Sequence, residues 1–200
     1  MESESLGNTL RRELARKGVH CLGLSIPLAH ILIGKVEALV ICMALLSSSI
    51  LFEWIRVREY PLFPFKRVEA YIARPRERAA IGAHVYLCAS AIATIVLFPE
   101  KIAVAALTSM ILGDAAAAIA GVSLGRHKSP LCEGKSVEGA LAGALVAGVT
   151  VYMLMNPSYA VGTFILFLLL DLIELGVDDN IVLPVAIALQ LWVFNLALGG

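Results

Sequence analysis

The sequence has few charged residues, and neither sign of charge is in excess. Asp, Glu, Lys and Arg make up 16% of its 200 residues, and sixteen basic residues balance sixteen acidic ones. We therefore expect no nucleic-acid partner, because such partners require a basic surplus. With 59% hydrophobic residues, a soluble fold of this length could not bury its apolar side chains. The composition indicates a membrane protein.

Cysteine is also scarce, and its spacing suggests neither a metal site nor a redox pair. The four residues are Cys21, Cys42, Cys88 and Cys132, with no CxxC pair and no Cys/His cluster. Three of them lie in apolar segments, which favours a role as small buried side chains. A cleavable signal peptide is not expected, because the first apolar run contains Pro27 and His30 and lacks a small-residue cleavage site.

What the sequence does contain is a series of long apolar runs. A helix needs roughly 20 mostly apolar residues to cross the hydrocarbon core of a bilayer. Seven runs approach this length, at residues 18–33, 36–55, 79–98, 102–121, 137–155, 159–175 and 181–198. We predict an all-α fold, a single integral membrane domain over residues 1–200 that crosses the bilayer about seven times. The first run is short and interrupted, so a re-entrant or surface helix is an alternative there.

The basic residues fall on alternate connections between these runs. Fourteen of the sixteen Lys and Arg residues lie in residues 1–17, 56–78 and 122–136, and the other two are Lys35 and Lys101. Because cytoplasmic loops hold the excess of Lys and Arg, we place these three segments and the N-terminus in the cytoplasm. Segment 56–78 mixes aromatic and basic residues, which favours the membrane surface; an ordinary exposed linker is the alternative.

Several carboxylates lie within the apolar runs. An ionisable residue in a membrane span costs a few kcal/mol on insertion scales, so it needs a partner or a function. Asp114 lies in the fourth run, and Asp171 and Glu174 lie near the end of the sixth. If the sixth helix continued beyond Gly176, then Asp171, Glu174 and Asp178 would share one face. Carboxylates so close together would require a cation, and Mg²⁺ prefers such oxygen ligands.

These acids also have structural explanations. Asp114 could make a polar contact between helices, and Asp178, Asp179 and Asn180 could cap the last helix. Residues 113–121 and 139–148 carry Gly or Ala at four-residue spacing. Such stripes let helix backbones approach closely in lipid, so we predict that these two segments pack together and place Asp114 beside the loop between them.

That loop, residues 122–136, contains glycines, three cations and a hydroxyl before a predicted helix. Gly134-Lys135-Ser136 resembles the end of a P-loop, but Ser129 stands where that motif has Gly. No strand precedes the loop either, which excludes a Walker A site. Its residues can still hold phosphates at a helix N-terminus, although an ordinary positively charged cytoplasmic loop is the alternative.

Five short blocks occur in a characteristic order along most of the chain. They are Arg16-Lys17-x-x-His20, Gly113-Asp114 to Gly121, Gly125-Arg126-His127-Lys128, Lys135-Ser136-Val137-Glu138-Gly139, and Glu174 with Asp179-Asn180-x-x-x-Pro184. Their combination resembles the membrane kinases that phosphorylate polyprenol, dolichol, phytol or diacylglycerol with CTP. Each block is weak alone, but together they are fairly specific.

The resemblance implies transfer of the terminal phosphate of CTP to a membrane isoprenoid alcohol or diradylglycerol, with Mg²⁺ as cofactor and the site facing the cytoplasm. It implies catalytic roles for Asp114, Lys135 and Asp179, and metal binding by Asp114, Glu174 and Asp179. The implied nucleotide-binding residues are Gly113, Gly121, Arg126, His127, Lys128, Ser136, Glu138, Gly139 and Asn180. Glu138 is expected to orient Lys135, while Lys17, His20 and Glu174 are the expected accessory or substrate residues.

Two other functions stay open. The block at residues 135–139 also resembles phosphatidate cytidylyltransferases, which make a CDP-lipid but are usually longer. An ion-coupled transporter is the non-enzymatic alternative, since carboxylates within the membrane also mark ion pathways. Against a transporter, the acids cluster toward one face and no repeated pair of broken helices is present. The sequence leaves the acceptor lipid and the oligomeric state open.

Overall fold

The computed structural model describes residues 2–58, 81–132, 134–173 and 176–198, and this part of the chain is helical without a strand. The predicted all-α fold is therefore confirmed for these residues. The elements are α1 (Glu2–Cys21), the 3₁₀ turn η1 (Leu22–Leu24), α2 (Ser25–Ile33), α3 (Lys35–Val57), α5 (Ala83–Leu97), α6 (Glu100–Leu124), α7 (Val137–Leu154), α8 (Pro157–Leu172) and α9 (Asp179–Ala197).

Four of the helices are long and apolar enough to cross a bilayer, namely α3, α6, α7 and α9. Helices α5 and α8 are apolar but shorter. The first predicted run is divided among the end of α1, η1 and the nine-residue α2. The apolar helices indicate a membrane-embedded protein; seven crossings and a cytoplasmic N-terminus stay predictions.

Polar caps set the beginnings of the later helices. The side chain of Asn156 accepts a hydrogen bond from the amide of Ser158 at the start of α8, and Pro157 follows the cap. Asp178 Oδ1 accepts from the amide of Asn180 at the start of α9. These contacts satisfy amides that have no partner within the helix, and the predicted capping of the last helix is confirmed.

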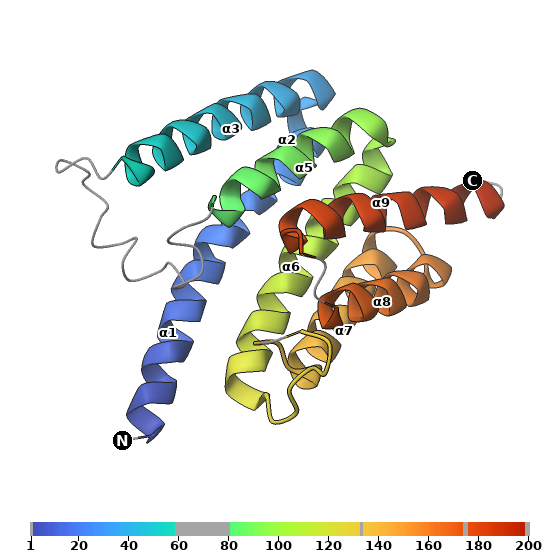
Figure 1. Ribbon diagram of the computed structural model, residues 1–200. Coiled ribbons are helices and arrows are strands. Elements are labelled where there is room, and N and C mark those ends of the chain that lie inside the picture. The colour runs from blue at the N-terminus through green and yellow to red at the C-terminus, as the bar shows by residue number, and fades with distance from the viewer. Residues whose placement is uncertain (1, 59–80, 133, 174–175, 199–200) are drawn as a thin grey trace.

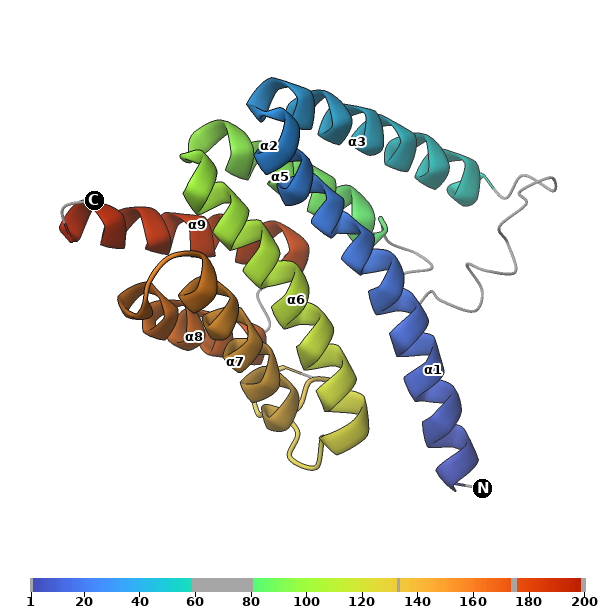
Figure 2. The same ribbon diagram turned by 180° about the vertical axis from the view of Figure 1, so that it is seen from behind.

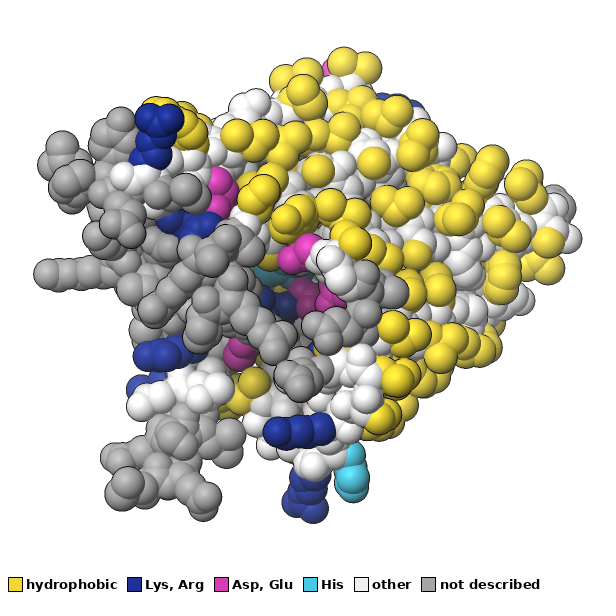
Figure 3. Space-filling model, in the orientation of Figure 1, with side chains coloured by type: hydrophobic (Ala, Val, Ile, Leu, Met, Phe, Trp, Pro, Cys, Tyr) yellow, Lys and Arg dark blue, Asp and Glu magenta, His cyan; other side chains and the backbone are white. Residues whose placement is uncertain are grey.

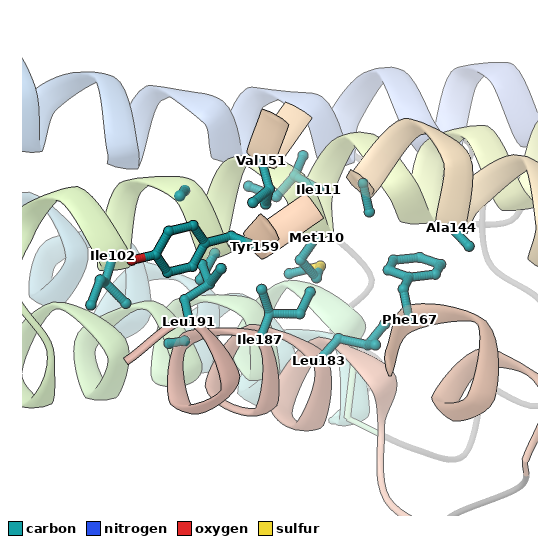
Figure 4. Close-up of a cluster of buried hydrophobic side chains, with 14 of the residues drawn as sticks. Ile102, Met110, Ile111, Ala144, Val151, Tyr159, Phe167, Leu183, Ile187 and Leu191 are labelled. Atoms are coloured by element: carbon teal, nitrogen blue, oxygen red, sulfur yellow. The ribbon is translucent and has the colours of Figure 1, made fainter. Parts of the chain in front are cut away.

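Helix α6 lies at the centre of the bundle (Figures 1 and 2), in contact with α1, α2, α5, α7 and α9. Figure 4 shows buried side chains from four helices converging on one core. They are Ile102, Met110 and Ile111 of α6, Ala144 and Val151 of α7, Tyr159 and Phe167 of α8, and Leu183, Ile187 and Leu191 of α9. This packing positions the ends of α6, α7, α8 and α9 relative to one another.

The predicted packing of small residues between α6 and α7 is confirmed. A Cβ atom added to Gly143 would lie 2.8 Å from Ala117 Cβ and 2.9 Å from the carbonyl oxygen of Gly113. A Cβ atom added to Gly139 would lie 2.7 Å from the carbonyl oxygen of Ala117. Because real Cβ atoms do not approach other atoms so closely, only glycine lets the two backbones reach this distance.

We expect Gly143→Ala to destabilise the protein by about 1–3 kcal/mol, the usual cost of overpacking. The melting temperature of the purified protein in detergent should fall accordingly. Gly7→Ala in α1 is the matched control, since a Cβ atom there has no neighbour within 4 Å and alanine favours a helix. Equal melting temperatures for Gly143→Ala and wild type would contradict the close α6–α7 contact.

Charged and apolar side chains are segregated on the surface (Figure 3). Hydrophobic side chains cover much of the visible face, whereas acidic and basic side chains gather at one end, around a hollow. Helix α3 at the edge of the bundle adds exposed apolar side chains, including Val40, Met43, Ile50 and Trp54. An apolar surface this extensive is unusual for a soluble monomer and is suited to lipid.

Candidate functional site

A cavity of about 200 Å³ lies at the charged end of the bundle, where Figure 3 shows acidic and basic side chains together in a hollow. Its ionisable lining comes from several elements and comprises Arg16, Lys17, Asp114, Lys135, Asp171, Asp178 and Asp179. The rest of the lining is small or polar, namely Ala83, Ala117, Ala118, Gly121, Val122, Gly134, Ser136, Gly139, Ala140 and Asn180. The cavity thus combines side chains of both charges with small residues, which allow close approach to the backbone.

Lys135 connects two carboxylates from different helices. Its Nζ donates hydrogen bonds to Asp171 Oδ1 at 2.8 Å and to Asp179 Oδ2 at 2.6 Å. Asp171 lies one residue before the end of α8 and is buried, with 6% of its surface exposed. Asp179 is the first residue of α9. The α6–α7 loop therefore contributes a cation that holds the ends of α8 and α9 together.

The charge of Lys135 is maintained by its partners. Burial disfavours the charged amine and lowers its pKa, but attraction and hydrogen bonds from Asp171 and Asp179 outweigh this effect. The net result is a pKa above the ordinary value of a lysine. Lys135 is therefore a permanent cation in the cavity at neutral pH.

A second ionic cluster surrounds Asp114 of α6. Lys17 of α1 donates a hydrogen bond to Asp114 Oδ2, and His20 Nε2 lies 3.3 Å from the same oxygen. Lys17 is buried, with 3% of its surface exposed. Its neighbour Arg16 pairs with Glu13 at 2.8 Å. Helix α1 thus places Lys17 and His20 beside the carboxylate of Asp114 in α6.

The two clusters share one cavity, since Asp114, Lys135 and Asp179 all line it. Acidic residues from separate helices thus lie together with basic groups of the α6–α7 loop and of α1. Among the residues implied to bind nucleotide, Gly121, Ser136, Gly139 and Asn180 also line the cavity. Their chemical roles stay predictions, because proximity alone does not establish a reaction.

Glu138 does not contact Lys135, so the expectation that it orients Lys135 was wrong. Its Oε1 lies 2.6 Å from His127 Nδ1, and both carboxylate oxygens accept the amide hydrogen of His127 at 3.2 Å. The reason is the folding of the loop, in which the Val137 amide donates to the His127 carbonyl. An isolated β-bridge between Lys128 and Ser136 closes the same loop.

The loop cations Arg126 and Lys128, together with His127, are exposed and are not part of the cavity lining. Their predicted contacts with nucleotide phosphates would require a ligand that extends beyond the cavity. The loop itself is anchored to the bundle, because Ser129 Oγ donates a hydrogen bond to the carbonyl oxygen of Leu172 at 2.8 Å. Of the three predicted loop cations, Lys135 alone lines the cavity.

A common helical face for Asp171, Glu174 and Asp178 required the sixth helix to continue beyond Gly176, and this condition is not met. Helix α8 ends at Leu172, and Gly176 has a φ of +68°, a left-handed conformation that interrupts a helix. Asp178 then caps the new helix α9. Two further predictions cannot be compared: Glu174 lies outside the described residues, and so does most of segment 56–78.

Sequence reasoning left Asp171 out of the catalytic and metal-binding sets, although it is a central member of the site. The available signal was its position as a carboxylate within an apolar run, which by itself suggests a function. Asp178 and Arg16 also line the cavity without having been assigned to it.

The aspartates of the cavity are not arranged as a ready metal site. In the described part of the chain, no group of three or more His, Cys, Asp or Glu side chains is close enough to hold an ion. Asp114 is paired with Lys17, and Asp171 and Asp179 are paired with Lys135. A cation would therefore have to replace a lysine contact at these oxygens.

Comparisons of the chain with protein-family models, curated proteins and solved structures found no match. Function is therefore inferred from the cavity and from the sequence blocks to which its residues belong. Four of those blocks contribute to the lining, through Arg16 and Lys17, Asp114, Lys135, and Asp179.

Proposed function

We propose that this protein is a membrane-embedded lipid-alcohol kinase that transfers the terminal phosphate of CTP to a hydroxyl of an isoprenoid alcohol or diradylglycerol. The observation that carries the proposal is the convergence of Asp114, Lys135, Asp171 and Asp179 on one cavity at the charged end of an apolar helix bundle. The order of the sequence blocks supports CTP as donor and a lipid alcohol as acceptor.

The phosphates would bind beside the start of α7. Ser136 caps this helix by accepting a hydrogen bond from the Gly139 amide, and Lys135 precedes the cap. A helix N-terminus carries a partial positive charge that attracts phosphate. Lys135 adds a full charge, and Gly134 has a φ of +91° with no neighbour within 4 Å of an added Cβ. This side of the cavity can therefore accept anionic oxygens.

A divalent cation would balance the excess negative charge of the cavity. The cavity lining contains four aspartates against Arg16, Lys17 and Lys135, so a polyphosphate would add negative charge to a wall that is already acidic. Asp114, Asp171 and Asp179 carry carboxylate oxygens of the kind that Mg²⁺ prefers, but they do not form one three-residue group, so phosphate oxygens would have to complete the shell of the ion. Mg²⁺ bound there would neutralise charge on the transferred phosphate and on the departing CDP.

The reaction needs little covalent participation by the protein. The alcohol oxygen attacks the terminal phosphorus of CTP, and the bond between that phosphorus and the bridging oxygen of CDP breaks. The lipid phosphate and CDP are formed, and the alcohol proton passes to a cavity carboxylate. Lys135 is placed to stabilise the charge on the phosphoryl oxygens, and the carboxylates orient the hydroxyl.

The size of the cavity suits a reaction at the membrane surface. A volume of about 200 Å³ accommodates phosphates and a hydroxyl, so the nucleoside would extend toward the cytosol. Small side chains, including Ala117, Ala118 and Ala140, form part of the wall. An alcohol whose tail remains in the bilayer would reach the site with only its polar end.

The direct test uses purified protein in phospholipid nanodiscs with Mg²⁺, polyprenol, phytol or dioleoylglycerol, and CTP labelled at either the γ- or the α-phosphate. We expect label to reach lipid from γ-labelled CTP and not from α-labelled CTP. Transfer of the α-label with release of pyrophosphate would identify a cytidylyltransferase. Absence of both labels from every lipid would refute the kinase proposal.

A further inference from the structure

One buried oxygen in the cavity wall lacks a partner. Asn180, the second residue of α9, lines the cavity and has 9% of its surface exposed. Within the described part of the chain, its side-chain oxygen Oδ1 accepts no hydrogen bond. Buried polar atoms are nearly always paired in folded proteins, and one that is not paired calls for a specific explanation.

The identity of the unpaired atom is set by its neighbour. Asn180 Nδ2 donates a hydrogen bond to Asp178 Oδ1 at 2.7 Å, and the Asn180 amide donates to the same oxygen at 2.9 Å. Rotating the side-chain amide by half a turn would place Oδ1 against this carboxylate oxygen, with two acceptors in contact. Asn180 therefore presents an acceptor, and the missing group is a hydrogen-bond donor.

A hydrogen bond from α5 fixes the backbone of Asn180. Ser90 Oγ of α5 donates to the Asn180 carbonyl oxygen at 2.6 Å, and Ser90 is itself 3% exposed. Ser90 Oγ also contacts the carbonyl oxygen of Leu87 at 3.0 Å, and Leu183 lies one helical turn after Asn180. Both leucines are buried in the hydrophobic core.

The proposed function places the phosphates of CTP and the alcohol hydroxyl inside the cavity and the nucleoside, with its own donors, outside it. The choice at this oxygen is therefore between a phosphate and the hydroxyl. A fully ionised phosphate has no hydrogen to donate, so it would face Asn180 Oδ1 with a repulsive lone pair. An alcohol hydroxyl supplies the missing donor. We infer that Asn180 Oδ1 accepts a hydrogen bond from the hydroxyl of the lipid alcohol, an inference that rests on the proposed function.

This positioning role differs from the nucleotide contact that the sequence resemblance implied for Asn180. A hydroxyl held by Oδ1 keeps its oxygen lone pairs available for attack on phosphorus, and its hydrogen passes from this hydrogen bond to a cavity carboxylate as the bond to phosphorus forms. Asp179, the preceding residue, is bound to Lys135, so α9 would present the acceptor alcohol next to the cation that faces the phosphates. Asn180 and Lys135 would thus hold the two reactants on neighbouring parts of one cavity.

The experiment measures binding and needs no turnover. Binding of farnesol and of dioleoylglycerol to protein in nanodiscs is compared with binding of their methyl ethers, which lack the donor hydrogen. Wild type should prefer at least one alcohol over its ether by about tenfold, and Asn180→Ala should lose the preference. Ser90→Ala is the matched control, because it removes a hydrogen bond to the Asn180 backbone and leaves Oδ1 in place.

A second variant separates the free oxygen from the bond to Asp178. Asn180→Asp combined with Asp178→Asn retains an oxygen acceptor at position 180 and exchanges donor and acceptor in the contact with residue 178, so the preference for alcohol should persist. If this double variant loses the preference together with Asn180→Ala, the free oxygen is not responsible and the inference is wrong. No preference in wild type, or an intact preference in Asn180→Ala, would also overturn it.

Two further outcomes distinguish this inference from the kinase proposal and from a metal ligand. Alcohol preference that depends on Asn180, without phosphate transfer from CTP, would refute the kinase and leave the alcohol site standing. If Asn180→Ala keeps its preference for alcohol but needs more Mg²⁺ for half-maximal transfer, a cation rather than a hydroxyl binds Oδ1. That result would overturn the inference while supporting the enzyme.

Discussion

Lys135→Met should lower phosphate transfer by about 1,000-fold, the scale of losing one strong electrostatic contact to a transition state. The substitution removes the only ammonium group that contacts both Asp171 and Asp179 within the described residues, at 2.8 and 2.6 Å. Initial rates with γ-labelled CTP and a saturating lipid alcohol measure the effect. Turnover within tenfold of wild type would exclude Lys135 from the reaction.

The same substitution should also destabilise the fold, and a second change separates the two effects. Breaking a buried ion pair leaves an uncompensated charge and costs about 3 kcal/mol or more, and the Asp171 side chain is only 8% exposed. Adding Asp171→Asn to Lys135→Met removes that stranded carboxylate. The double variant should regain melting temperature and remain inactive. Recovery of activity together with stability would show that Lys135 serves only the fold.

Asp114→Asn should reduce transfer by about 100- to 1,000-fold with a smaller loss of stability. The amide preserves the size of the side chain, and Asp114 is partly exposed at 21% of its side-chain surface. What is lost is the negative charge that faces Lys17 and His20 and that a metal ion would require. Rates measured across a range of Mg²⁺ concentrations should show that added Mg²⁺ does not restore wild-type turnover.

Glu53→Gln is the matched control for Asp114→Asn. Glu53 is a buried carboxylate near the end of α3, paired with Arg56 at 2.5 Å, and it does not line the cavity. Its replacement also removes a charge from an ion pair, so it should affect stability while leaving turnover within about twofold of wild type. Comparable losses of activity in both variants would indicate a general sensitivity to charge removal. Asp114 would then have no specific role in the reaction.

The local features of the chain could be predicted with good accuracy. The apolar runs at residues 36–55, 102–121 and 137–155 correspond closely to α3, α6 and α7. Helix formation in these runs depends on neighbouring residues and on uninterrupted apolar length, both of which the sequence displays directly. The small-residue stripes likewise predicted the α6–α7 contact, because close backbone approach depends on the absence of side chains.

Predictions that depended on the path of the chain between helices were less successful. The sequence left open whether the sixth helix continued beyond Gly176 or whether a polar residue after it capped the last helix. In the structure α8 ends at Leu172, and α9 begins with Asp178 as its cap. Glu138 was expected near Lys135 from helical spacing, whereas the loop folds back and presents His127 instead. Turn geometry and loop closure bring together residues that no periodic pattern relates.

The sequence by itself determined that this is a helical protein suited to a bilayer, which residues bear charge within apolar segments, and which helix surfaces are small enough to pack closely. Tertiary structure decided which charges meet. Lys17 reaches Asp114 across 97 residues, and Lys135 reaches Asp171 and Asp179 across 36 and 44 residues. Apolar length is a property of consecutive residues, but the pairing of charges depends on how α1, α6, α8 and α9 pack around one cavity.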